Sequence, residues 1–193
     1  MTNRVAPVYI GLIHYPVYNK NMEVVTTSIT NLDLHDISRS ATTYNVDKYY
    51  IVHPVPVHQQ VVSNVLSYWT EGYGAIYNPD RKEAFKRVVL IDTLEQAVAD
   101  IKFIHGEDPV LVTTDARTYP NTVAYSWLKS EIQTNKKPIF ILFGTGWGLE
   151  EKAMKAADYI LEPIKGAGDY NHLSVRAAVA IILDRLLGED WWQ

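Results

Sequence analysis

The stretch at residues 138–148, PIFILFGTGWG, decides the fold of this 193-residue chain. Residues 138–143 are apolar and read as a strand buried on both faces, which is typical of a parallel sheet. Three glycines follow within the next five residues, and a short amphipathic segment over 149–157 comes directly after them. A strand, a glycine turn and a helix in this order indicate an α/β protein. The turn is either purely structural or a ligand site, because glycine amides and helix N-termini approach ligands closely.

Strands and helices alternate on both sides of this stretch. Apolar runs predict further strands over 8–13, 49–52, 88–91, 110–112 and 159–161. Helical spacing predicts helices over 61–69, 94–104, 125–132 and about 174–187, with a turn-rich stretch around 78–80. We therefore expect one α/β domain over residues 1–193, with a mostly parallel sheet and helices on both faces.

Composition excludes several classes of site. The absence of cysteine excludes disulfides, cysteine-rich zinc sites and iron–sulfur clusters, and the six histidines include no pair at metal-ligand spacing. We therefore expect no metal. The chain has no apolar run of the roughly 18 residues that a membrane span needs, and its start does not resemble a signal peptide. We expect a cytoplasmic protein that does not enter a membrane.

The net charge of -4 argues against a protein that coats nucleic acid by bulk attraction, although a local basic patch could still bind RNA. The first candidate for such a patch is Arg81, Lys82, Lys86 and Arg87, and Lys136 with Lys137 is the second. A solvated surface is the alternative interpretation, because runs of charge are usually exposed.

Two glycine-bearing loops are candidates for a binding site. The first, at 144–148, is not a P-loop, because no Gly-Lys-Ser/Thr closes it, and its G-x-G-x-G spacing departs from the dinucleotide fingerprint. The second follows the strand at 159–161 and carries polar side chains between Pro163 and Ser174. Ligands of open α/β sheets bind outside the carboxyl ends of strands, so the loops after the last three strands should converge on one site.

A third candidate segment is 32–41, LDLHDISRSA, which reads as a loop entering a helix. Asp36 and Arg39 are three residues apart, so an ion pair within the helix is feasible. Asp33, His35 and Asp36 could contact a metal, but capping and surface roles are favoured for them. No G-x-S-x-G elbow occurs, so a hydrolase triad has no nucleophile to build on.

Three segments in this order resemble the three motifs of SPOUT RNA methyltransferases, and most closely the branch related to tRNA guanine-N1 methyltransferase. They are Asn31 with Arg39-Ser40-Ala41, residues 141–149 (ILFGTGWGL) and residues 172–178 (HLSVRAA). The resemblance implies a deep C-terminal trefoil knot, in which the last helix passes through an earlier loop. It also implies a homodimer through the knot region and the terminal helices, S-adenosyl-L-methionine bound in the knot, and an RNA substrate.

The resemblance also implies roles for individual residues. By analogy with the first-motif arginine of the family, Arg39 would hold an RNA phosphate or stabilise the methyl acceptor. If the acceptor is a ring nitrogen, Asp36 or Asp169 would accept its proton. The residues expected to bind the cofactor are Thr113, Leu142, Phe143, Gly144, Thr145, Gly146, Trp147, Gly148, Ile160, Leu161, Pro163, Ile164, Tyr170, Asn171, His172, Leu173, Ser174 and Ala177.

Two departures from the family pattern leave the acceptor atom open. Many relatives have Glu where this chain has Gly146 or Trp147, and His172-Leu173-Ser174 replaces a common Asn-Val-Ser. The expected function is methyl transfer to a base nitrogen or a ribose oxygen of tRNA or rRNA. The alternatives are a non-catalytic module on the same fold that binds a nucleotide or RNA, and a dehydrogenase with an unusual glycine loop.

Overall fold

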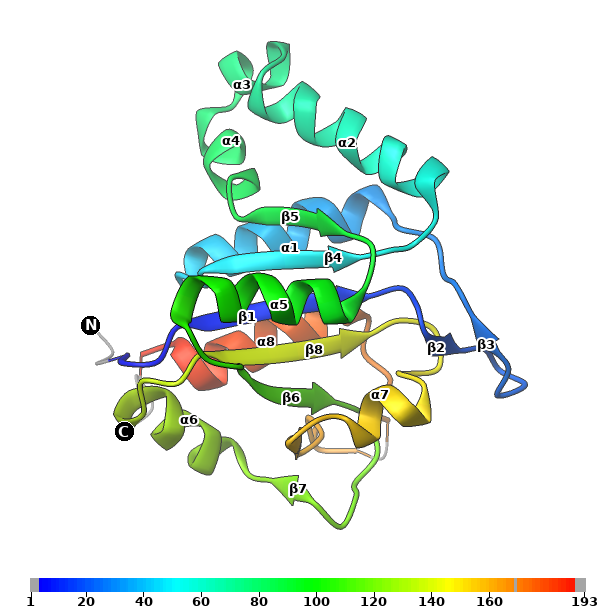
Figure 1. Ribbon diagram of the computed structural model, residues 1–193, viewed down its shortest axis with the longest axis vertical. Helices are drawn as coiled ribbons and strands as arrows, with labels where there is room; N and C mark the ends of the chain where they lie inside the picture. Colours follow the sequence, from blue (N-terminus) through cyan, green and yellow to red (C-terminus); the bar gives the residue numbers. More distant parts are fainter. Residues whose placement is uncertain (1–3, 169, 190–193) are drawn as a thin grey trace.

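The computed structural model describes residues 4–168 and 170–189 (Figure 1). Its centre is a seven-stranded sheet in the order β5-β4-β1-β8-β6-β9-β7, and every pair of neighbours is parallel. In chain order these strands are β1 (Val8–Ile13), β4 (Lys48–Val52), β5 (Val88–Ile91), β6 (Val110–Thr114), β7 (Thr122–Val123), β8 (Ile139–Gly144) and β9 (Tyr159–Leu161). A small antiparallel pair, β2 (Val17–Tyr18) and β3 (Val24–Val25), lies beside it.

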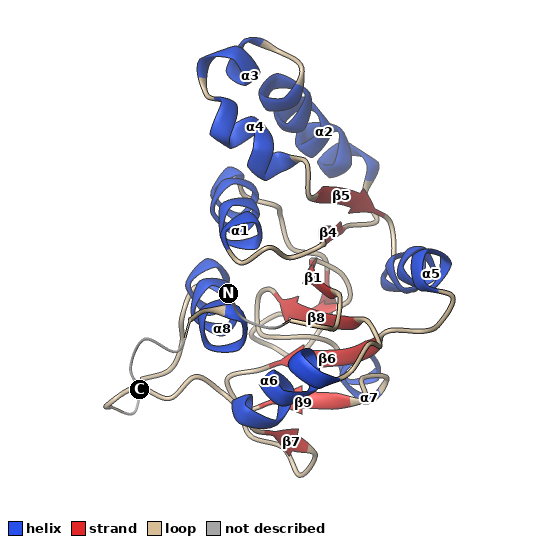
Figure 2. Cartoon of the chain, turned by 90° about the vertical axis from the view of Figure 1, so that its left-hand side faces the viewer, coloured by secondary structure: helices blue, strands red, loops and turns tan. Residues whose placement is uncertain are grey.

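Helices cover both faces of the sheet, as predicted (Figure 2). On one face α1 (Asn31–Thr43), α6 (Tyr125–Thr134) and α8 (Val175–Leu187) enclose one apolar core. On the other face α5 (Leu94–His105) and α7 (Glu151–Lys155) enclose a second core. The helices α2 (Pro56–Thr70), α3 (Tyr73–Tyr77) and α4 (Pro79–Phe85) connect β4 to β5 and extend beyond the β5 edge.

The central strands β1 and β8 position the candidate site. All six residues of β1 are buried, and its register with β8 places Ile13 beside Gly144. Gly11 lets the two strands pack with Phe140, because a Cβ at Gly11 would lie 2.9 Å from the Phe140 ring. The residues that follow β1 therefore lie next to the glycine loop that follows β8.

Some element boundaries differ from the sequence-based expectation. The turn-rich stretch around 78–80 is the start of α4, because Asn78 caps the helix through the Arg81 N–H and Pro79 occupies its first turn. Likewise α2 begins at Pro56, five residues before the expected start, and residues 32–41 lie within α1 rather than in a loop. Asn and Pro mark helix starts as well as turns, which explains the first of these errors.

The strand order does not reveal the path of α8 relative to the loops, so the trefoil knot stays a prediction. Across residues 4–168 and 170–189, none of the helices has the length and apolar character needed to cross a membrane.

Candidate functional site

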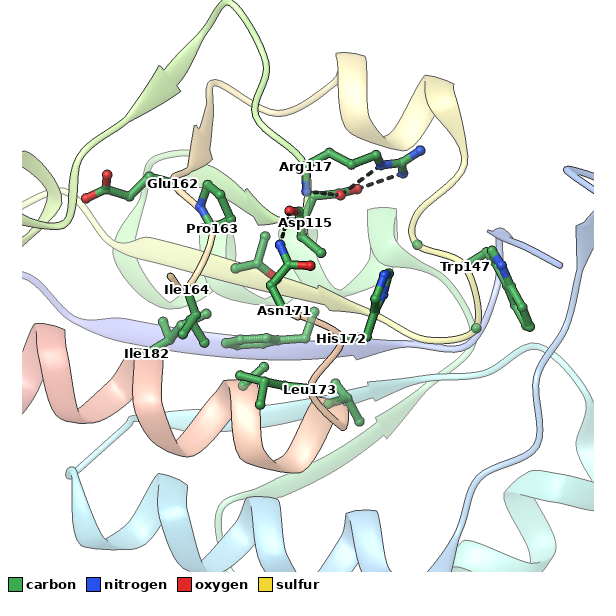
Figure 3. Close-up of a pocket in the computed structure, with 18 of the residues that line it drawn as sticks. Asp115, Arg117, Trp147, Glu162, Pro163, Ile164, Asn171, His172, Leu173 and Ile182 are labelled. Atoms are coloured by element: carbon green, nitrogen blue, oxygen red, sulfur yellow. Dashed lines mark hydrogen bonds and ion pairs between the residues drawn. The ribbon is translucent and has the colours of Figure 1, made fainter. Parts of the chain in front are cut away.

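The loops after β6, β8 and β9 converge at the carboxyl end of the sheet and surround a cavity of about 570 Å³ (Figure 3). This volume lies within the range of roughly 300–1,000 Å³ that small-molecule sites occupy. Its lining consists of Met22, Thr114, Asp115, Ala116, Arg117, Phe143, Gly144, Gly146, Trp147, Gly148, Glu162, Pro163, Ile164, Asn171, His172, Leu173, Val175, Ala178 and Ile182. The cavity is where the sequence predicted that the loops would meet.

The glycine loop after β8 owes its shape to two left-handed residues and to β2. Gly146 has φ +62° and Gly148 has φ +101°, conformations that other residues adopt only with strain. A Cβ at Gly146 would lie 2.8 Å from the Tyr18 carbonyl oxygen. That oxygen accepts a hydrogen bond from the Trp147 N–H at 2.9 Å, and the Tyr18 N–H donates to the Gly148 oxygen at 2.9 Å.

A chain of hydroxyl groups fixes the other side of this loop. The Thr145 hydroxyl donates to the Ile13 carbonyl at 3.0 Å, because that carbonyl can only accept. Thr145 Oγ1 then accepts from the Thr27 hydroxyl, and Thr27 Oγ1 accepts from His14 Nδ1 at 3.0 Å. The order of donors assigns the proton of the neutral His14 ring to Nδ1.

His14 and His53 support Thr27 as neutral, buried side chains. His53 Nε2 donates to the Thr27 carbonyl at 3.1 Å, and its Nδ1 accepts from the Val55 N–H at 3.1 Å. Burial, together with the smaller effects of the nearby His53 and His58, lowers the pKa of His14 to about 3. Burial likewise lowers the pKa of His53. Both rings are therefore hydrogen-bonding groups and not charges at neutral pH.

The loop after β6 contributes an ion pair. Asp115 Oδ1 accepts from Arg117 Nε at 3.0 Å and Oδ2 accepts from Nη2 at 2.9 Å, and these hydrogen bonds raise the pKa of Arg117 (Figure 3). The Asp115 side chain is 5% exposed, whereas that of Arg117 is 55% exposed. Asp115 thus holds in place a guanidinium that remains accessible from outside.

The loop from β9 to α8 is tied to its neighbours. Asn171 Nδ2 donates to the Ala116 carbonyl at 2.7 Å, and Glu162 Oε1 accepts from the Tyr125 N–H at 2.9 Å. Ser174 caps α8 by accepting from the Ala177 N–H at 3.3 Å. The cavity therefore has walls that hydrogen bonds connect to each other.

Ten of the residues expected to bind the cofactor line this cavity: Phe143, Gly144, Gly146, Trp147, Gly148, Pro163, Ile164, Asn171, His172 and Leu173. The others lie around it. Leu142 and Ile160 point into the α5 side of the core, because side chains alternate along a strand. Thr113 and Leu161 are buried, Thr145 donates a hydrogen bond to Ile13 of β1, and Tyr170 is exposed. Ser174 caps α8, and Ala177 lies in the first turn of that helix.

Nine lining residues were not predicted from the sequence: Met22, Thr114, Asp115, Ala116, Arg117, Glu162, Val175, Ala178 and Ile182. A helical pattern could have identified the last three, because positions i, i+3 and i+7 share one face. Asp115 and Arg117 follow a predicted strand, so the strand-end rule could have included them. Met22 belongs to the turn between β2 and β3, and no local signal links it to the cavity.

Two of the expected catalytic residues, Asp36 and Arg39, do not line this cavity. Asp36 and Arg39 are exposed on α1, and no contact joins them. Instead, Asp36 Oδ2 lies 3.4 Å from Arg176 Nε of α8, and Arg176 Nη1 lies 3.4 Å from Asp33 Oδ1. Arg39 has no hydrogen bond or ion pair with another residue in the described part of the chain. Asp169 lies outside the described residues.

The first predicted basic patch is partly committed to the fold. The Arg81 guanidinium lies 4.6 Å from the centre of the Trp69 ring, and Arg87 donates to the Val46 carbonyl and to Asn45 Oδ1. Lys86 pairs with Glu83, and Lys82 is exposed. Within residues 4–168 and 170–189, no cluster of histidine and carboxylate side chains could hold a metal ion.

Known proteins resemble this chain over most of its length. An uncharacterized protein of Aquifex aeolicus is 50% identical over 183 residues, which are 95% of this chain and 89% of the relative. A tRNA (guanine-N(1)-)-methyltransferase of Oleidesulfovibrio alaskensis is 41% identical over 94% of this chain, which spans only 42% of that relative.

Solved structures agree on the fold. The SpoU methyltransferase AviRb from Streptomyces viridochromogenes, solved in complex with AdoMet, matches with a TM-score of 0.58 at 14% identity, over 95% of this chain and 60% of that one. A family model described as SAM-dependent RNA methyltransferase matches residues 7–188. The predicted SPOUT resemblance is therefore confirmed, and this chain belongs to the family of SAM-dependent RNA methyltransferases.

Proposed function

We propose that this protein transfers a methyl group from S-adenosylmethionine to tRNA. The observation that carries the proposal is the meeting of three strand-end loops and α8 around one cavity of about 570 Å³. The long relative that matches this chain is named a tRNA methyltransferase, which supports tRNA as the substrate.

The residues of the cavity suit adenosylmethionine. Phe143, Ile164, Leu173 and Ile182 offer apolar surface to a planar base, and the backbone of the glycine loop offers amides and carbonyls to the adenosine. When bound, the cofactor supplies a methyl group that is already activated by a positively charged sulfur. The protein must then position the acceptor and receive the proton that it loses.

Arg39 and Asp169 remain our candidates for these tasks. Asp169 precedes the lining residues Asn171 and His172 by only two and three positions. We therefore propose that its carboxylate accepts the proton that the methyl acceptor loses. Asp36 is the weaker candidate for this role, because the guanidinium of Arg176 lies against its carboxylate.

Arg39 is exposed and outside its own cavity, which fits a role in the cavity of a second copy. We propose a cytoplasmic homodimer in which each site combines one protomer's cavity with the other's Arg39.

The test is to incubate the protein with labelled adenosylmethionine and total tRNA, and in a second reaction with total rRNA, and then to identify the methylated nucleoside by mass spectrometry. The nucleoside distinguishes a base nitrogen from a ribose oxygen. We expect the label in tRNA, and we expect Arg39→Ala to reduce the rate about 100-fold while cofactor affinity stays unchanged. Cofactor binding without any transfer, to tRNA or to rRNA, would favour the non-catalytic module instead.

A further inference from the structure

The charged side chains that line the cavity differ in how accessible they are to a ligand. Its described titratable side chains are Asp115, Arg117, Glu162 and His172. The Glu162 carboxylate accepts the Tyr125 N–H and is turned away from the cavity in Figure 3. The Asp115 carboxylate is enclosed by its own loop. Arg117 is therefore the permanently charged group of the described lining that is free to meet a ligand.

Asp115 orients this guanidinium but occupies only some of its N–H donors. Its two oxygens accept from Arg117 Nε and Nη2, and they also accept from the Arg117 N–H at 2.8 Å and from the Tyr119 hydroxyl at 3.2 Å. An arginine has five N–H donors, so three remain after these two side-chain bonds. They belong to a side chain that is 55% exposed.

The glycine loop leaves the ion pair uncovered. A Cβ at Gly148 would lie 3.4 Å from Arg117 Nη2 and 3.4 Å from Asp115 Oδ2. Since Gly148 has no side chain and a left-handed φ, its backbone passes directly beside the pair. The free donors of Arg117 thus lie next to the loop that the cofactor is proposed to contact.

Adenosylmethionine has one group that a guanidinium favours. The adenosine part is neutral, the sulfur and the α-amino group are positive, and only the α-carboxylate is negative. Arginine binds carboxylates through paired N–H donors, whereas it repels a sulfonium. We propose that Arg117 determines how the cofactor lies in the cavity by donating hydrogen bonds to its α-carboxylate, with Asp115 as the positioning residue. This inference rests on the proposed binding of adenosylmethionine.

Two ligands separate this contact from a general effect on the cavity. S-adenosylhomocysteine, the demethylated product, retains the α-carboxylate, whereas 5′-methylthioadenosine lacks the whole amino-acid end. Calorimetry would measure the affinity of both ligands for the unmodified protein, for the variants Arg117→Gln and Arg117→Lys, and for the control variant Lys155→Gln. Lys155 is an exposed cation of α7 that pairs with Glu151 and does not line the cavity.

We expect Arg117→Gln to weaken the binding of S-adenosylhomocysteine about tenfold or more and to change the affinity for methylthioadenosine less than about twofold. The affinity of Arg117→Lys for S-adenosylhomocysteine should lie between those of the unmodified protein and Arg117→Gln, because lysine keeps the charge and loses the planar guanidinium. Lys155→Gln should change neither affinity. Equal weakening of both ligands, together with a lower melting temperature, would overturn the proposal in favour of a structural role.

Unchanged S-adenosylhomocysteine affinity with weaker tRNA binding would also overturn it, because Arg117 would then contact RNA phosphate. A protein that binds neither ligand in its unmodified form would overturn the proposed function and this inference with it.

Discussion

Thr27 connects the glycine loop to the end of β1 through its hydroxyl group, which accepts from His14 and donates to Thr145. Replacing Thr27 by Val removes both contacts and leaves the buried His14 Nδ1–H without an acceptor. An unpaired buried donor costs about 1–3 kcal/mol, so we expect a loss of that size in the free energy of unfolding. Urea denaturation measures it, and calorimetry should show weaker binding of S-adenosylhomocysteine because Thr145 loses its support.

The control for this change is Thr26→Val. Thr26 is exposed and has no hydrogen bond to another residue of the described chain, so this variant should stay within about 0.5 kcal/mol of the unmodified protein. Equal stability of the two variants would mean that the hydroxyl chain contributes nothing to folding.

His14 should make stability depend on pH. Burial is the main reason that its pKa falls from 6.5 to about 3. Between these two pH values the unfolded chain therefore binds a proton at His14, whereas the folded chain does not. This contribution to stability is complete above about pH 6.5 and is lost as the pH falls toward 3, with a slope of up to about 1.4 kcal/mol per pH unit. The variant His14→Gln lacks this proton, so the gap in unfolding free energy between the two proteins should shrink as the solution is acidified.

Urea denaturation at several pH values between 4 and 7 measures that gap. Two parallel stability curves would contradict the prediction, because they would show that His14 binds its proton equally in both states.

At the scale of elements, the loop between β8 and α7 depends on Gly146. In the variant Gly146→Ala the new methyl group would meet the Tyr18 carbonyl at 2.8 Å, in a backbone conformation with φ +62°. We expect a loss of about 1–3 kcal/mol in unfolding free energy and a loss of cofactor affinity, since the loop must shift.

The matched control is Gly166→Ala, because a Cβ at Gly166 would have no atom within 4 Å and its φ is not left-handed. Thermal unfolding and calorimetry on both variants test the comparison. Comparable effects of the two substitutions would show that the geometry of Gly146 is not the cause.

Elements whose signal is local could be predicted from the sequence. The strands β1 and β8 are continuous apolar runs, and the glycine loop follows β8 directly, so both were expected. The segment that forms α3 and α4 could not be read in the same way, because Asn78-Pro79 suits a turn and a helix start equally well. The tertiary structure selects between them by packing Phe85 into the core.

The part of the site that could not be predicted depends on contacts between distant residues. Met22 reaches the cavity because β2 is held against the glycine loop through Tyr18. Asp36 pairs with Arg176, which is 140 positions away in the chain, and not with Arg39, three positions away. Spacing along a helix reveals which pairs are feasible, but it does not reveal a competitor on another helix.

At the scale of the whole molecule, α8 makes two separate sets of contacts. Its residues Val175, Ala178 and Ile182 line the cavity, whereas Arg176 of the same helix pairs with Asp33 and Asp36 of α1. The pairing fixes α1, and with it Arg39, to a helix whose other face closes the cavity. A methyl acceptor bound in that cavity would therefore meet Arg39 only if a second copy supplied it.

Hybrid dimers test this proposed division between protomers. A protein with Arg39→Ala keeps its cavity, and a protein with Gly146→Ala keeps Arg39 but should not bind the cofactor, so each alone should be nearly inactive. In a two-fold symmetric dimer, mixing them by denaturation and joint refolding gives hybrids in which one of the two sites is intact. We expect the mixture to recover about one quarter of the activity of the unmodified protein, because half of the dimers are hybrids with half of their sites working. Labelled methyl transfer to tRNA measures the recovery. A mixture as inactive as its components would show that Arg39 acts on the cavity of its own chain, and an active Arg39→Ala protein would show that Arg39 has no part in the reaction.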